Sequence, residues 1–166
     1  MIKEIEIIHN TIFQKSGLHV SHIVTDSECE EYLGYNFTLN QLSIKFRKAK
    51  ITPKKAGQFV TLWRRNTETK ETEPFNIDDK FDFYIIAAES DKRFGFFFFP
   101  KNILSEMQII SASSKVGKRG FRVYPDWAIP TSKQAEKTQK LQAEFFINIF
   151  ESNCLEKFSN ILQTPT

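Results

Sequence analysis

Eight basic side chains and no acidic one lie between residues 32 and 67. The chain of 166 residues carries 23 basic and 20 acidic residues, a net charge of +3, so the part outside this segment sums to −5. A dense run of cations attracts polyanions, because Lys and Arg side chains neutralise phosphates. The segment therefore predicts a surface for nucleic acid. Its basic residues are Lys45, Arg47, Lys48, Lys50, Lys54, Lys55, Arg64 and Arg65.

Aromatic residues alternate with these cations, among them Phe46, Phe59 and Trp63. The alternation over 42–49 and 58–65, with Thr-Pro-Lys-Lys-Ala-Gly between, predicts two strands joined as a hairpin by a turn at 52–57. The cations would lie on phosphates, while an aromatic ring would either stack on an unpaired base or pack in the core. We expect Trp63 in the core. The competing interpretation is that the charges are only the solvated face of a hairpin.

A second group of side chains suits metal chemistry. Asp78, Asp79 and Asp82 precede or open an apolar run at 82–88, and Glu89 and Asp91 follow it. Carboxylates at a strand end can hold Mg²⁺ for phosphodiester hydrolysis. Asp is also the usual residue of turns at such junctions, and we expect that role here.

Two glycines flank a Lys-Arg pair at 117–120, which adds Lys118 and Arg119 to the cations, and Arg122 follows. Glycine lets a backbone approach an anion closely, so this segment suits a phosphate-contacting loop, although a plain turn accounts for it equally well. It lacks the pattern of a nucleotide-binding P-loop.

Several classes of protein are disfavoured. The amino terminus interleaves charges with apolar residues, unlike a signal peptide, and the apolar run at 94–100 is too short to cross a bilayer. We expect a cytoplasmic protein without a membrane contact. Cys29 and Cys154 lie far apart, which indicates reduced structural thiols and not a zinc site. We expect no bound metal or cofactor.

The pattern of apolar residues predicts one α/β domain over 1–166. We expect a helix at 2–15 that Gly17 terminates, a short helix at 26–35, and strands at 35–37, 42–49 and 58–65. The apolar runs at 82–88 and 94–99 predict two central strands that are buried on both faces and joined by a tight polar turn at 89–93. Helices must then cover both faces of a mixed sheet. A capping box at Thr131 and Gln134 begins a helix that we expect to reach about Glu151, and a short helix follows near 154–162.

The order of motifs resembles the MepB-like family of small bacterial proteins. The pattern reads FRxAKxTPxKxGxFVxxWxR over 46–65, GxFxFPK over 95–101 and RVYPxW over 122–127, with Asp82 opening an apolar strand. The resemblance implies a restriction-endonuclease-like, or PD-(D/E)xK, α/β/α fold. That motif would place its first acid at Asp82 and its lysine at Lys101, but Phe99 stands where the second acid belongs. Loss of that carboxylate removes a metal ligand and favours a binding protein over a nuclease.

We therefore predict a non-enzymatic nucleic-acid-binding protein. One alternative is a Mg²⁺-dependent nuclease that uses Asp82 and Lys101, with Asp79 or Glu89 supplying the missing carboxylate. A second is a protein–protein adaptor whose basic hairpin meets an acidic partner. The residues predicted to contact nucleic acid are Arg47, Lys50, Lys54, Lys55, Arg65, Lys101 and Arg122.

Overall fold

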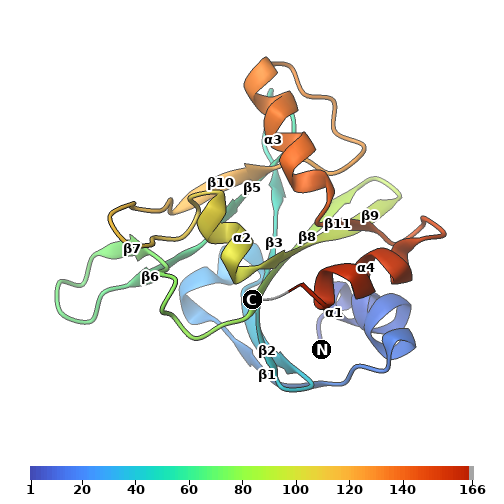
Figure 1. The fold of residues 1–166 in the computed structure, drawn as a ribbon, viewed down its shortest axis with the longest axis horizontal. Helices are drawn as coiled ribbons and strands as arrows, with labels where there is room; N and C mark the ends of the chain where they lie inside the picture. Colours follow the sequence, from blue (N-terminus) through green and yellow to red (C-terminus); the bar gives the residue numbers. More distant parts are fainter. Residues whose placement is uncertain (165–166) are drawn as a thin grey trace.

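A six-stranded mixed sheet organises the chain in a computed structural model that describes residues 1–164 (Figure 1). The strand order is β1-β2-β3-β8-β9-β11, with β3 and β8 parallel and the other neighbours antiparallel. The strands are β1 (Val20–Thr25), β2 (Tyr35–Leu39), β3 (Leu42–Lys48), β8 (Phe83–Ser90), β9 (Arg93–Pro100) and β11 (Phe146–Asn148). The prediction of an α/β fold with a mixed central sheet is confirmed.

The two central strands, β8 and β9, form the predicted hairpin. They are joined by a tight turn in which Asp91 adopts a positive φ of 56°. Their side chains are buried on both faces, which explains why the sequence reads as nearly continuous apolar runs.

Helical segments cover one face of the sheet. The amino-terminal helix continues without a break from α1 (Lys3–Ile8) through a π-helical turn (η1, His9–Phe13) and a 3₁₀ turn (η2, Gln14–Ser16), and it ends at Gly17 in the left-handed conformation, as predicted. It packs beside α4 (Cys154–Leu162), which also matches the prediction. Phe13, Phe96 and Phe158 meet in this layer, which accounts for part of the high Phe content.

The other face is covered mainly by a second sheet, which corrects the expectation of helices on both sides. This sheet has the order β10-β5-β4, from β4 (Lys50–Ile51), β5 (Gln58–Thr61) and β10 (Gly120–Val123). Val60 and Phe121 pack against the main sheet, and the Tyr84 hydroxyl donates to the carbonyl of Thr61 at 2.7 Å. The short helix α2 (Lys101–Glu106) contributes Leu104 to the same layer.

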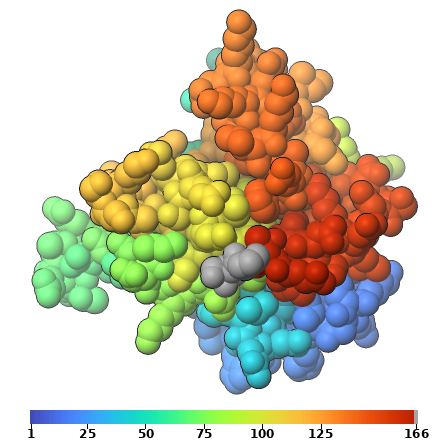
Figure 2. Space-filling model, viewed as in Figure 1, coloured from blue at the N-terminus to red at the C-terminus, as the bar shows by residue number. Residues whose placement is uncertain are grey.

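The predicted hairpin of 42–49 with 58–65 is therefore wrong in its pairing. β3 stays in the main sheet between β2 and β8, and the chain then passes to β4 in the second sheet. Only Lys50 and Ile51 pair with β5 across the turn at 52–57. Beyond β5, β6 (Trp63–Arg65) pairs with β7 (Thr72–Pro74), and this hairpin projects from the body at the left of Figure 2.

The long carboxyl-terminal helix also ends earlier than predicted. α3 (Lys133–Ala143) is capped by Ser132, whose side chain accepts from the backbone of Ala135, and not by the predicted Thr131. Phe146, which continues the helical stripe in the sequence, lies in β11 and packs on Phe97 at 4.7 Å between ring centroids. Gly95 makes this docking possible, because a Cβ there would lie 2.4 Å from the Phe146 ring.

The remaining 3₁₀ segment, η3 (Ser27–Tyr32), confirms the predicted short helix, with Asp26 as its amino-terminal cap. Among residues 1–164, none of the helices combines the length and apolar content that a bilayer span needs.

Candidate nucleic-acid interface

Most of the basic segment is neutralised by acids from other parts of the chain. Five of its eight cations form ion pairs, and every partner lies outside 32–67. Three partners belong to the stretch 26–31 that precedes the segment. The pairs are Arg47 with Asp26, Lys48 with Glu4 and Glu89, Lys50 with Glu31, Arg64 with Glu73 and Asp79, and Arg65 with Glu28. The acidic run just before the segment was the available sequence signal, and it was missed.

Arg47 is the clearest departure from the predicted interface. Its side chain is only 1% exposed, and its guanidinium donates to the Asp26 carboxylate at 2.5 Å and to the carbonyl of Phe46 at 2.7 Å. Gly34 passes over this pair, where a Cβ would lie 3.2 Å from the guanidinium. Arg47 therefore joins η3 to the main sheet and cannot reach a phosphate.

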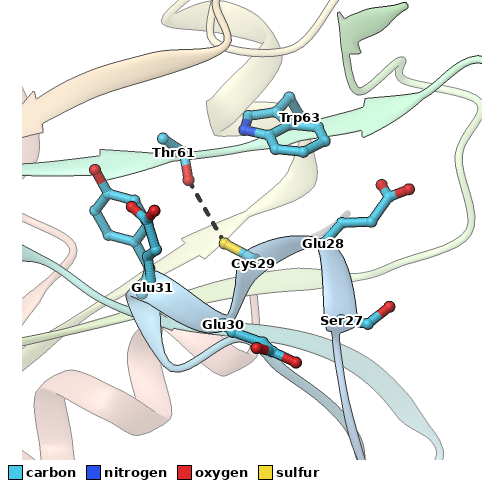
Figure 3. Close-up of a pocket in the computed structure, with 8 residues that line it drawn as sticks. Ser27, Glu28, Cys29, Glu30, Glu31, Thr61 and Trp63 are labelled. Carbon is cyan, nitrogen blue, oxygen red and sulfur yellow. Dashed lines mark hydrogen bonds between the residues drawn. The ribbon is translucent and has the colours of Figure 1, made fainter. Parts of the chain in front are cut away.

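Lys50 and Arg65 are half-exposed but lie beside an acidic hollow. This hollow, of about 410 Å³, is lined by residues 27–32 of η3 with Thr61 and Trp63. Figure 3 shows the Cys29 sulfur pointing toward the Thr61 hydroxyl, 3.5 Å away, and the glutamates carried on the same segment as Cys29. Lys50 lies over the Tyr32 ring and Arg65 over Trp63. A hollow ringed by Glu28, Glu30 and Glu31 is unfavourable for a polyanion.

Trp63 is thus not in the core, contrary to the prediction. It is half-buried and belongs to neither of the two core clusters.

Lys45 is half-buried, with its ammonium turned toward protein groups. Its ammonium donates to Asn36 at 3.2 Å and lies 4.5 Å from the centroid of the Phe75 ring. Burial lowers its pKa, and the neighbouring Arg47 lowers it further. Lys48, three residues along the same strand, shows the opposite result: burial opposes its charge, but Glu89 and Glu4 together outweigh that effect and raise its pKa.

Lys54 and Lys55 differ from the other cations of the segment. They are exposed in the turn between β4 and β5, and among residues 1–164 neither has an ion-pair partner. Lys54 adopts a positive φ of 66°, which shapes the tip of the turn.

Arg122, which lies on β10, holds this turn in place through three hydrogen bonds. Its guanidinium donates to the hydroxyl of Thr52 at 2.6 Å and to the carbonyls of Ala56 and Gly57 at 3.1 and 3.4 Å. Gly57 has a φ of 75° and lies against the Tyr124 ring, where a Cβ would be only 2.8 Å away. We call residues 52–57 the braced turn. It lies at the same end of the molecule as α3, because Gln142 of α3 donates to the carbonyl of Arg122 (Figure 1).

Asp82 and Lys101 lie side by side through a backbone hydrogen bond, at the end of the central hairpin opposite its turn. Asp82 bonds the start of β8 to β3, accepting from the Ser43 backbone at 2.8 Å, and its own carbonyl accepts from the backbone of Lys101. The Lys101 ammonium donates to the carbonyl of Asp79 at 2.8 Å and lies near the Phe81 ring. Lys101 is therefore remote from the braced turn.

The neighbouring side chains do not fit the Mg²⁺ site of a nuclease. Phe99 is fully buried in the second core cluster, and both Asp79 carboxylate oxygens are engaged, one by Arg64 and one by the backbone of Asn76. Glu89 lies near the far end of β8, roughly 23 Å along an extended strand from Asp82. Within the described residues, no group of three or more His, Cys, Asp or Glu could hold a metal ion. Of the two acids that could supply the missing carboxylate, Glu89 is therefore distant from Asp82, and Asp79 is held by Arg64 and the backbone of Asn76.

The family assignment comes from comparison with known proteins. The model of the MepB-like family matches residues 26–148. The crystal structure of MepB superposes with a TM-score of 0.79 at 30% identity, covering 92% of this chain and all of the MepB chain. A bacterial homing endonuclease matches with a TM-score of 0.46 at 14% identity over 97% of each chain, which is too distant to bear on function. No curated protein sequence matches the chain.

Proposed function

We propose, from the premise that this chain belongs to the MepB-like family, that it binds nucleic acid without cleaving it and contacts phosphates through the braced turn. The observation that supports this proposal is that Lys54 and Lys55 are exposed and have no ion-pair partner among the described residues. They are exposed cations on a turn that Arg122 and Gly57 hold in one conformation, so little conformational freedom is lost when a phosphate is bound.

The distance of the turn lysines from acidic side chains also favours the braced turn as the phosphate-binding site. Lys50 and Arg65 lie within 4 Å of glutamates, so a phosphate that approached them would be repelled by the same carboxylates. The braced turn carries no acidic residue, and Arg122 adds a third positive charge beneath it. Lys and Arg on phosphates position a protein without reading base sequence, so we expect weak sequence preference.

The test compares two double variants that each lower the net charge by two. Lys54→Ala with Lys55→Ala removes the turn cations, and Lys50→Ala with Arg65→Ala removes two ion-paired cations. Binding to one DNA probe is measured over a range of salt. The turn variant should lower the slope of log K against log salt by about 1.4 to 1.8, whereas the control should leave it nearly unchanged.

Equal slopes for the two double variants would refute a contact at the turn, because removal of the turn cations would then have no more effect than removal of the ion-paired cations. Absence of binding to any nucleic acid at low salt would refute the proposed function itself. Folding should survive in the turn variant, because exposed substitutions usually change stability by about 0.5 kcal/mol or less.

A further inference from the structure

A small pocket opens directly beside the braced turn. It has a volume of about 260 Å³ and lies between the braced turn, the end of β8 and the loop that follows Tyr124. This is below the usual size of a pocket for a drug-sized ligand, and it suits a single ring system. Its lining residues are Ile51, Ala56, Gly57, Gln58, Ser90, Trp127, Ala128 and Ile129. We call it the Gln58 pocket.

The rim of the Gln58 pocket is apolar and exposed. Ile51 is 63% exposed and Ile129 is 81% exposed, and both line the opening. Trp127 forms part of the wall and is held there by an edge-to-face contact with Phe146 at 5.5 Å. Aliphatic and indole surfaces grouped around one opening favour a flat apolar ring over a strongly hydrated ligand.

One polar side chain reaches the pocket from the interior. Gln58 is only 3% exposed, and its side-chain nitrogen donates to the carbonyl of Glu89 at 3.2 Å. Its side-chain oxygen has no hydrogen-bond partner among residues 1–164. Buried polar atoms normally have partners, so a ligand that brings a donor to this amide would satisfy it.

Cations flank the opening on two sides. Lys54 and Lys55 directly precede the pocket residue Ala56, and the Arg93 guanidinium lies 5.4 Å from the centroid of the Trp127 ring. Two carboxylates are also close. Asp91 is paired with Arg93 at 3.9 Å, so Arg93 is excluded as a phosphate contact on the same ground as Lys50 and Arg65, and Asp126 accepts from the Asn148 amide at 3.1 Å. An apolar slot with an amide inside and cations around it matches a base that carries phosphates on either side.

We propose that the Gln58 pocket takes one unpaired base of single-stranded nucleic acid. The base would contact Trp127, Ile51 and Ile129, hydrogen-bond to the Gln58 amide, and leave its flanking phosphates on Lys54 and Lys55. This inference rests on the proposed function and adds a preference for single strands, because a base inside a duplex cannot enter the pocket.

The experiment compares a short oligothymidylate with an abasic strand of equal length, which keeps the phosphates and lacks the bases. In the full chain carrying Trp63→Phe, Trp127 is the only indole, so its fluorescence reports on the pocket. We expect the oligothymidylate to quench this emission and to bind roughly 5- to 150-fold more tightly than the abasic strand. A duplex of equal length should bind more weakly than the oligothymidylate and should not quench.

The base-binding proposal would be overturned by equal binding of the two strands, or by saturated binding of oligothymidylate without a change in Trp127 emission. Phosphate binding by the turn would remain supported in either case. Binding of neither strand at low salt would overturn both proposals.

Two exposed substitutions test the pocket without removing a packed side chain. Ile129→Glu places a carboxylate at the rim, and Val24→Glu places the same charge on the exposed part of β1, at the far end of the molecule (Figure 1). The first should reduce the preference for the base-carrying strand to below about 5-fold, and the second should leave the preference unchanged. If the two variants retain the same preference, the base does not enter here.

Discussion

The cations on the strands and the cations in the braced turn have opposite surroundings although they are adjacent in the sequence. Arg47, Lys48 and Lys50 each meet an acid contributed by another part of the chain. Lys54 and Lys55, a few residues later, have no ion-pair partner among the described residues. Charge density along a chain is therefore a poor guide to the charge that a ligand meets, because folding places distant acids beside a basic strand and leaves a projecting turn alone.

The largest expected effect concerns the buried ion pair between Arg47 and Asp26. Asp26→Ala should lower the free energy of unfolding by about 3–5 kcal/mol, because it leaves the Arg47 guanidinium buried without its carboxylate. Urea denaturation measures this, and Glu30→Ala, an exposed acid of the same segment, serves as the control. A loss below about 1 kcal/mol would mean that the Arg47 ion pair contributes little, and that these cations are more like the turn lysines than we infer.

A smaller effect should show whether Arg122 supports the braced turn or contacts a phosphate directly. Arg122→Ala should destabilise the protein by about 1.5 kcal/mol, because three oxygens of the braced turn lose a charged donor. Affinity for nucleic acid should fall while the salt slope stays constant, since Lys54 and Lys55 remain.

Arg119→Ala is the matched control, because within residues 1–164 that arginine makes a single side-chain hydrogen bond, of 3.4 Å to the carbonyl of Thr72. A slope reduced by about 0.7 to 0.9 in the Arg122 variant alone would show a direct phosphate contact, as the sequence predicts.

The smallest effect concerns pH. The pKa of Lys45 is lowered in the folded protein, first by burial and then by Arg47, so between its folded and unfolded pKa values the unfolded chain binds more protons. Stability from this group therefore rises with pH as the folded-state pKa is passed and levels off near the ordinary value of 10.5. The Lys45→Met variant should lack this rise in stability with pH.

The difference in unfolding free energy between wild type and Lys45→Met should thus shift in favour of the wild type from pH 7 to pH 10. Other titrating groups are common to both proteins and cancel. A shift in the opposite direction would show that the Phe75 ring and Asn36 stabilise the ammonium more than burial opposes it.

The sequence alone was sufficient for elements whose signals are local. The central hairpin was predicted because continuous apolar runs on either side of a polar turn are typical of paired strands buried on both faces, and the amino-terminal helix because its apolar period ends at Gly17. The turn at 52–57 was found from its own Thr-Pro and Gly residues. The family resemblance, now established, also came from the order of these motifs.

Tertiary structure decided what depends on neighbours distant in the chain. The apolar spacing around Phe146 predicted a continuing helix, but pairing with the edge of β9 beside Gly95 made these residues a strand. Arg47 and Lys54 carry the same charge, but only the fold could place one under η3 against Asp26 and the other on a braced turn. Residue type sets which interactions a side chain can make, whereas its burial and partners depend on segments that meet only after folding.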